Sequence, residues 1–466
     1  QSTWGAKENS QLHAVLFPWF AYGHVIPFVH LSNKLAENGH IISFLLPRSV
    51  QIKISSLILY PHLIKFYTLS IPKIPNLPTN AETTADLSME FYHLLFNAFD
   101  KTQDQVRILL TDLKPDFVFY DLACWVSRLK ESKPKPFKTV VYQVVNAAML
   151  AYTLVPSRMM LSNRISEAEL EELKQPPPNF PKTSIKVSHY EVFKVLSTVF
   201  KREVEGDLSF YERTSKVVEE SDAVALMSCN ELEGKFCEYL REEYKKPVLL
   251  TGPILPPPLD LEEKWATWLD RFGVGSVVYC SIGSQVVLEK NQLQELVLGL
   301  EMVDLPFLVA LSPPKGCDSI EEALPSGLKE RVDGRALIYG GWVPQPQILR
   351  HPSVGCFVGH CGLGCMWEAM HSNCQIVLIP QMVDHYMGAM LMVEELQVAL
   401  QVERGENGWI SKENLCHAVK TVMDGESKVV KDLKANHTKL RETIFNQEYE
   451  DNCIKNFIDQ LRQLSD

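Results

Sequence analysis

Several features that mark other protein classes are missing from this sequence. No run reaches the about 20 apolar residues of a membrane-spanning helix. The polar start, Gln1 to Ser10, lacks the apolar core of a signal peptide. Lys and Arg number 46 against 57 Asp and Glu, giving a net charge of −11. Nucleic-acid binding needs clustered basic residues, so we predict no nucleic-acid partner. From the missing apolar segments we predict a cytoplasmic protein without a membrane span.

Zinc and dinucleotide motifs are missing too. The 11 cysteines are scattered, and Cys361 and Cys365 lie four apart with no second pair. This spacing predicts reduced thiols and no zinc site. The turn after the first apolar run, Pro18 to Gly23, lacks the GxGxxG pattern. A nicotinamide-dependent dehydrogenase is therefore excluded.

Short apolar runs alternate with helical patterns in the first half of the chain. Residues 13–17 read as a strand, a helical pattern ends at Gly39, and residues 41–46 read as the next strand. Longer helical patterns cover 86–112 and 192–220. Strands that are apolar throughout are typical of a parallel sheet covered on both faces. Further such runs lie at 64–69, 117–120, 140–145 and 223–227.

A proline-rich segment at 252–258 interrupts this alternation, which then starts afresh. The second set of apolar runs lies at 277–281, 307–311, 336–339, 355–358 and 376–379. We predict an α/β fold with two Rossmann-like, doubly wound domains that face a cleft. The predicted parts are a first domain at 1–251, a linker at 252–262, a second domain at 263–440 and a C-terminal helix at 441–466 that packs back on the first domain.

The segment from Trp342 to His385 carries the strongest chemical signal. A strand at 355–358 leads into a glycine-containing turn, His360 to Cys365, and a helix opens after it. Such a turn offers backbone N–H groups and a helix dipole to an anion. An exposed Trp342 would give a nucleobase a flat face, and Glu368 could accept hydrogen bonds from a ribose diol.

A candidate catalytic pair lies in the first half. His24 follows the first strand and Asp121 ends the fourth, so both are expected at the carboxyl edge of one sheet. A histidine oriented by a carboxylate is a good general base. No second carboxylate accompanies Asp121, which argues against a retaining glycosidase.

The 44 residues from Trp342 to His385 resemble the signature box of plant family 1 UDP-glycosyltransferases. The resemblance extends over the whole chain and implies the GT-B fold, with an acceptor-binding first domain and a UDP-sugar-binding second domain. It also implies an inverting reaction and a His24–Asp121 dyad that deprotonates the acceptor hydroxyl. Trp19 and Tyr22, beside His24, are predicted to contact the acceptor. No metal or other cofactor is expected, and no DxD pair accompanies the box. The matching positions are Trp342, Pro344, Gln345, His351, His360, Gly362, Glu368, Pro380 and Asp384.

The resemblance also implies a role for each donor-site residue. Trp342 would stack on uracil with Gln345 beside it, Glu368 would bind the ribose, and His360 the diphosphate. Asp384 and His385 would hold the donor sugar. The complete predicted donor set is Ser284, Trp342, Val343, Gln345, His360, Gly362, Gly364, Cys365, Glu368, Asp384 and His385.

Three positions depart from the family pattern. Cys365 stands in place of a serine, so a weaker donor would face the phosphate. Leu363 and Gly364 replace a Trp-Asn pair, which removes an amide contact. His385 replaces a glutamine that often accompanies UDP-glucose, and histidine there is associated with UDP-galactose or UDP-arabinose.

Several short segments of the second half are similar to the sequences of one branch of the family, among them Met366-Trp367-Glu368 and Glu394-Glu395-Leu396. Enzymes of that branch add a sugar to the sugar of a flavonoid or related glycoside. We therefore expect a monomeric transferase that takes a UDP-sugar and a flavonoid glycoside. The alternatives are transfer to an aglycone and a catalytically silent UDP-sugar-binding protein.

Overall fold

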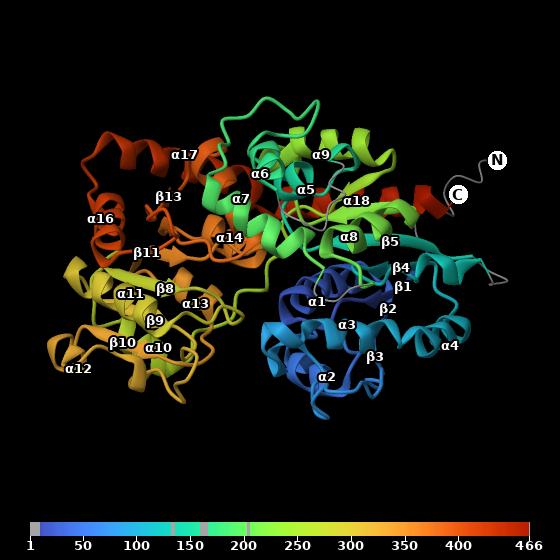
Figure 1. The fold of residues 1–466 in the computed structure, drawn as a ribbon, viewed down its shortest axis with the longest axis horizontal. Helices are drawn as coiled ribbons and strands as arrows, with labels where there is room; N and C mark the ends of the chain where they lie inside the picture. Colours follow the sequence, from blue (N-terminus) through green and yellow to red (C-terminus); the bar gives the residue numbers. More distant parts are fainter. Residues whose placement is uncertain (1–9, 132–135, 159–165, 203–205, 466) are drawn as a thin grey trace.

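The computed structural model describes residues 10–131, 136–158, 166–202 and 206–465. Two separate parallel sheets form its two halves (Figure 1). The first sheet has seven strands in the order β3-β2-β1-β4-β5-β6-β7. Its strands are β1 (His13–Phe17), β2 (Ile41–Leu46), β3 (Ile64–Thr68), β4 (Phe117–Tyr120), β5 (Lys138–Gln143), β6 (Ala223–Leu226) and β7 (Val248–Leu250).

The second sheet has six strands in the order β10-β9-β8-β11-β12-β13. Every registered pair in both sheets is parallel; Leu16 of β1, for example, lies opposite Phe44 of β2 and Phe119 of β4. The strands are β8 (Val277–Ser281), β9 (Phe307–Ala310), β10 (Ala336–Tyr339), β11 (Val354–Gly359), β12 (Gln375–Leu378) and β13 (Leu400–Gln401).

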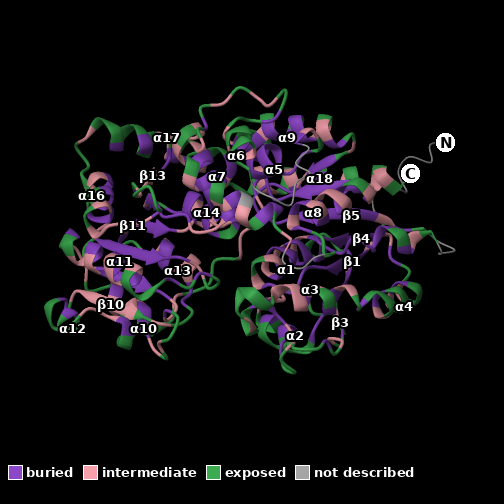
Figure 2. Ribbon diagram, in the orientation of Figure 1, coloured by how far each residue is buried: buried purple, intermediate pink, exposed green. Residues whose placement is uncertain are grey.

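Helices cover both sheets, so the central strands are buried and the outer helix faces exposed (Figure 2). Every residue of β4, β6 and β8 is buried, which explains why these runs are apolar without alternation. The helices of the first half are α1 (Tyr22–Glu37), α2 (Arg48–Ile54), α3 (Tyr92–Asp100), α4 (Gln103–Leu113), α5 (Ala147–Thr153), α6 (Glu167–Lys174), α7 (His189–Val195), α8 (Phe210–Glu220) and α9 (Asn230–Tyr244). Those that follow are α10 (Glu263–Leu269), α11 (Lys290–Val303), α12 (Leu328–Arg331), α13 (Gln345–Arg350), α14 (Leu363–His371), α15 (Val383–Met390), α16 (Lys412–Met423), α17 (Lys428–Ile444) and α18 (Gln447–Ser465).

The last helix returns to the first half. Phe457 of α18 lies 6.3 Å from Phe119 of β4, measured between ring centroids. Cys453 of α18 packs so closely on Gly252 that a Cβ there would lie 2.4 Å from the cysteine Cβ. Gly252 has φ +71°, so this contact uses a backbone that glycine adopts readily. The exact domain boundaries stay a prediction.

Two predicted helices are shorter and more broken than their sequence patterns suggested. The 86–112 pattern corresponds to α3 and α4 after two short 3-10 turns. The 192–220 pattern contains α7 and α8, and α8 begins where the Ser209 hydroxyl accepts the N–H of Glu212. This N-cap starts a new helix, because it satisfies an N–H that has no partner within the helix. Among the described residues, no helix has the length and apolar character needed to cross a bilayer.

Candidate active site

The topology brings two loops together at the centre of each sheet. The strand order reverses between β1 and β4 in the first sheet and between β8 and β11 in the second. Ligands in doubly wound folds bind outside the carboxyl ends of the strands at such switch points. His24 and Asp121 follow β1 and β4, while Ser284 and His360 follow β8 and β11. All four residues therefore lie at these switch points.

The first switch point holds a hydrogen-bonded pair. His24 lies in the first turn of α1, and its Nδ1 is 2.7 Å from Oδ2 of Asp121, although 97 positions separate them. The Asp121 side chain is 2% exposed, whereas that of His24 keeps 22%. One edge of the imidazole is thus anchored in the protein, while part of the ring is open to solvent.

Asp121 is held by three donors. Its Oδ1 accepts the backbone N–H of Trp19 at 2.8 Å and that of Leu122 at 2.7 Å, and its Oδ2 faces His24. A carboxylate with this surrounding acts only as an acceptor. The proton of a neutral His24 ring therefore lies on Nδ1, which leaves Nε2 free to accept a proton.

The second switch point holds a buried histidine. Glycines pack against the His360 ring, and a Cβ at Gly283 or Gly362 would lie 2.8 Å from its Nε2. Burial lowers the pKa of His360 to about 3, so the ring is neutral at pH 7. Its Nδ1 is buried and has no hydrogen-bond partner among the described residues. Gly362 is the N-cap of α14, and no side chain caps the helix there, so its first N–H groups are available to an anion.

A chain of side chains lies next to this turn. The Tyr279 hydroxyl donates to Oε1 of Gln345 at 3.1 Å, and Nε2 of Gln345 donates to Oε2 of Glu368 at 2.6 Å. Burial raises the pKa of Glu368 to about 7, although the Gln345 hydrogen bond opposes this. Trp342, just before this group, is 75% exposed, so its indole face is available for stacking.

Two further polar residues begin α15. The backbone N–H of Met382 donates to Nδ1 of His385 at 3.1 Å, which places the ring proton on Nε2. That Nε2 lies 4.0 Å from Oδ2 of Asp384. Burial lowers the pKa of His385 to about 3 and raises that of Asp384. A neutral N–H donor and a carboxyl group thus stand side by side, as binding to sugar hydroxyls requires.

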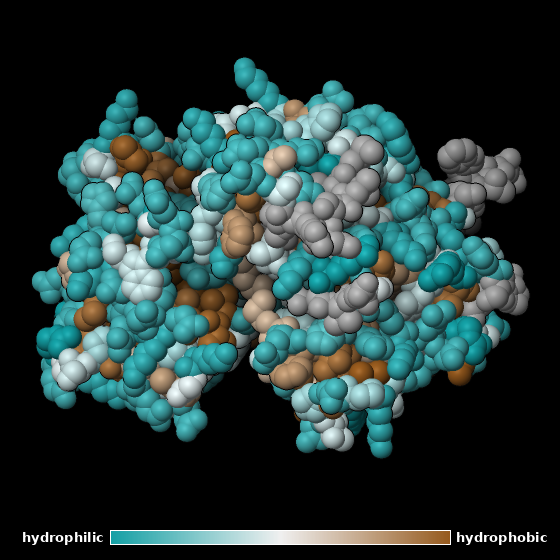
Figure 3. Space-filling view, in the orientation of Figure 1, coloured by the Kyte–Doolittle hydropathy of each residue, from teal (hydrophilic) through white to brown (hydrophobic). Residues whose placement is uncertain are grey.

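The two halves approach each other at these loops. A Cβ on Gly23 would lie 3.4 Å from Nε2 of Gln285, which follows Ser284 in the second half. Figure 3 shows a groove that opens between the halves at the lower edge of the view, with apolar surface on both sides.

Comparison with known proteins agrees with this geometry. Residues 181–440 match the family model for UDP-glucoronosyl and UDP-glucosyl transferase. An Arabidopsis thaliana anthocyanidin 3-O-glucoside 2'''-O-xylosyltransferase is 45% identical, covering 99% of this chain and 98% of the relative. An Ipomoea nil anthocyanidin 3-O-glucoside 2''-O-glucosyltransferase is 43% identical, with 98% and 99% covered. The chain belongs to this family of UDP-sugar-dependent glycosyltransferases.

Solved structures of plant glycosyltransferases share the fold. Arabidopsis thaliana UGT89C1 complexed with quercetin has a TM-score of 0.75 and 21% identity, covering 98% of this chain and 100% of that one. Glycyrrhiza uralensis UGT73P12 complexed with glycyrrhetinic acid 3-O-monoglucuronide has a TM-score of 0.78 and 19% identity, with 98% and 96% covered. The predicted GT-B fold with two Rossmann-like halves is confirmed.

Trp19 and Tyr22, which are predicted to contact the acceptor, are buried and half-buried in this structure of the glycosyltransferase. The Trp19 ring is 4% exposed and stacks on Phe96, with ring centroids 3.8 Å apart. Its observed contribution is the backbone N–H to Asp121, and an acceptor contact by its ring stays a prediction. Tyr22 is half-buried under the Lys53 ammonium, 4.1 Å from its ring centroid. Its hydroxyl pKa is raised by burial and by Asp86 and Glu82.

The structure also shows how four further residues that are predicted to bind the donor are packed. Cys365 is buried, and its Sγ would lie 3.0 Å from a Cβ on Gly359, so the thiol packs back on β11. Burial raises its pKa to about 12 and keeps it a neutral thiol. A Cβ on Gly364 would meet nothing within 4 Å, so the first turn of α14 is open. Ser284 is exposed and Val343 is buried, and their roles in binding the donor stay predictions.

Sequence reasoning missed Tyr279 and Gln285. Tyr279 lies in the apolar run 277–281, and the signal that points to it is that a tyrosine hydroxyl in a buried strand needs a partner. Among the described residues, no group of three or more His, Cys, Asp or Glu side chains could hold a metal.

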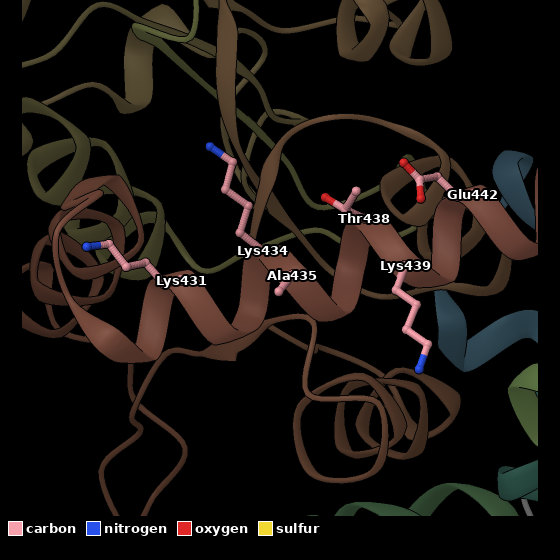
Figure 4. A pocket seen from close by; sticks show the side chains of 6 residues that line it. All are labelled: Lys431, Lys434, Ala435, Thr438, Lys439 and Glu442. Atoms are coloured by element: carbon pink, nitrogen blue, oxygen red, sulfur yellow. The ribbon is translucent and has the colours of Figure 1, made fainter.

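Figure 4 shows a surface hollow along α17, and none of its lining residues belongs to the candidate site.

Proposed function

We propose that this glycosyltransferase moves a sugar, with inversion, from a UDP-sugar to a hydroxyl on the sugar of a flavonoid glycoside. The observation that carries the proposal is the hydrogen-bonded His24–Asp121 pair, next to the contact of Gly23 with Gln285, the residue that follows Ser284. The acceptor class is supported by the names of the two relatives, both of which act on an anthocyanidin 3-O-glucoside.

In the proposed reaction, Nε2 of His24 removes the proton of the acceptor hydroxyl. The oxygen forms a bond to the anomeric carbon from the side opposite the diphosphate, and the bond between that carbon and the diphosphate oxygen breaks. Asp121 stabilises the imidazolium that results. Such base assistance is worth about 10²–10⁴-fold in rate.

UDP carries the negative charge that develops as it leaves. Neutral His360, the open first turn of α14 and its dipole are the groups that would stabilise this charge. Trp342 and Glu368 would hold the uridine, and Asp384 and His385 the sugar. We also propose that no cofactor takes part and that the enzyme acts as a monomer in the cytoplasm.

The test measures product mass by liquid chromatography and mass spectrometry. Cyanidin, quercetin and their 3-O-glucosides are each incubated with UDP-glucose, UDP-galactose, UDP-xylose and UDP-rhamnose. The control is His24→Ala, which removes the base but leaves the donor site intact. We expect a new mass on the glucosides only, absent in the control, and the donor that gives it names the transferred sugar.

Other outcomes separate the alternatives. Product on the free aglycones alone would overturn the acceptor proposal and keep the transferase. Binding of UDP without any product, equal in wild type and His24→Ala, would support a silent binding protein instead. Product formed equally by His24→Ala would contradict the role of this histidine.

A further inference from the structure

A tyrosine of the first half is inserted into the second half. Tyr190 lies near the start of α7, which Figure 1 labels, and α7 packs on α15. The Tyr190 ring stands edge-on to the ring of Tyr386 in α15, with centroids 6.1 Å apart. Because Tyr386 directly follows His385, this contact lies next to the residues proposed to hold the donor sugar.

The second half has a turn shaped to receive this ring. A Cβ at Gly408 would lie 2.1 Å from Cζ of Tyr190, closer than real atoms approach. Gly408 also has φ +80°, and its N–H donates to the carbonyl of Gly405 to close the turn. The position requires glycine for its conformation and for the space occupied by the ring.

An arginine connects the turn to the donor-sugar segment. Nη1 of Arg404 donates to the Gly408 carbonyl at 2.9 Å, and its Nη2 donates to the Pro380 carbonyl. The guanidinium lies 5.9 Å from the Tyr190 ring centroid and 5.8 Å from that of Tyr386. Its contacts thus fall on both ends of the segment 380–386, which contains Asp384 and His385.

These contacts form one assembly across the two halves. Tyr190 covers the guanidinium, the guanidinium holds the carbonyl of Pro380, and Pro380 starts the segment that carries Asp384. The first half also supplies the base, His24. Docking of α7 therefore fixes the sugar-binding segment relative to the half that holds the acceptor.

We propose that Tyr190 is a positioning residue, which docks on Gly408 and Arg404 and so orients Asp384 and His385 toward the donor sugar. The inference rests on the proposed UDP-sugar transfer and adds a determinant of sugar binding to it. Uridine and diphosphate are assigned to Trp342, Glu368 and His360, and of these only His360 touches the segment, edge-on to the His385 ring with centroids 4.7 Å apart. Loss of the docking should therefore weaken UDP-sugar binding far more than UDP binding.

The experiment compares the full-length wild type with Tyr190→Ala, Gly408→Ala and the double variant. Calorimetry gives the Kd of UDP and of the UDP-sugar that the wild type uses, and initial rates give KM and kcat. Two matched controls are Tyr190→Phe, which keeps the ring, and Phe193→Ala, which removes a 48% exposed ring from the same helix. Thermal unfolding checks that each variant is folded.

We expect Tyr190→Ala and Gly408→Ala each to raise the Kd and KM of the UDP-sugar about tenfold, since small misplacements of positioning groups cost up to ~10²-fold. The Kd of UDP should stay within about twofold, both controls should match the wild type, and the double variant should be no worse than the singles. Equal weakening of UDP and UDP-sugar, or no change in either, would overturn the proposal. Both Kd values are measured without turnover, so failure of the transferase proposal is distinguishable as missing product in the wild type.

Discussion

The substitution Asp121→Asn tests how the catalytic pair sets the proton on His24. Both backbone donors, the N–H groups of Trp19 and Leu122, point at Oδ1 of Asp121. An asparagine keeps these two hydrogen bonds only if its carbonyl oxygen takes that position. Its amide NH₂ then faces Nδ1 of His24, where the carboxylate oxygen was at 2.7 Å.

This orientation reverses the tautomer of His24. A ring nitrogen that faces an NH₂ group must accept, so the ring proton moves to Nε2. Nε2 then cannot take the acceptor proton, and the imidazolium loses its counter-charge. The variant should lose the whole contribution of the base. We therefore expect kcat to fall about 10²–10⁴-fold, which corresponds to a rise of roughly 3–5 kcal/mol in the activation free energy. Because both backbone hydrogen bonds survive, unfolding should change by about 1 kcal/mol or less.

The assay measures kcat with saturating donor and acceptor for Asp121→Asn, His24→Ala and their double variant. Asp112→Asn makes the same chemical change at an exposed position of α4 and serves as the control. The two active-site variants should be equally slow, and the double variant no slower, since the pair acts as a unit. Activity of Asp121→Asn within about threefold of the wild type would refute the tautomer argument.

Three further predictions concern the predicted donor site and the packing of the last helix, α18. Trp342→Ala should weaken UDP binding by about 1–3 kcal/mol in calorimetry while the unfolding temperature stays unchanged, because the ring is 75% exposed. The pKa of Glu368 is about 7 and its ionised form accepts from a ribose diol, so UDP-glucose should bind more tightly at pH 8 than at pH 6, and Glu368→Gln should abolish this dependence. Gly252→Ala should lower the unfolding temperature more than Gly39→Ala: both have positive φ, but only Gly252 would clash, with Cys453. Equal shifts for the two glycine variants would contradict that close packing.

The sequence was sufficient to predict the central strands, whereas β7 (Val248–Leu250) and β13 (Leu400–Gln401) at the sheet edges are too short to form a clear apolar run and were not predicted. Apolar runs without alternation identified the buried strands, and the polar residues after them, His24, Asp121 and His360, lie where the runs end. Parallel strands deliver their carboxyl ends to one edge, so order along the chain carries spatial information. Helix boundaries were less predictable, because a capping serine such as Ser209 divides a continuous helical pattern.

Contacts between elements far apart in the chain could not be predicted this way. The Trp19 ring could face the cleft or the core, and the stack on Phe96 that places it in the core depends on how α3 lies over the sheet. Likewise Gly408 and Arg404 lie in a polar turn whose sequence resembles that of an ordinary surface loop. The role proposed for this turn is visible only from its contacts with the Tyr190 ring. Residues that position others are chosen by packing across the two halves, whereas residues that touch substrate must lie at the strand ends. A local sequence pattern can therefore identify the residues that touch substrate, whereas the positioning residues are found only from the structure.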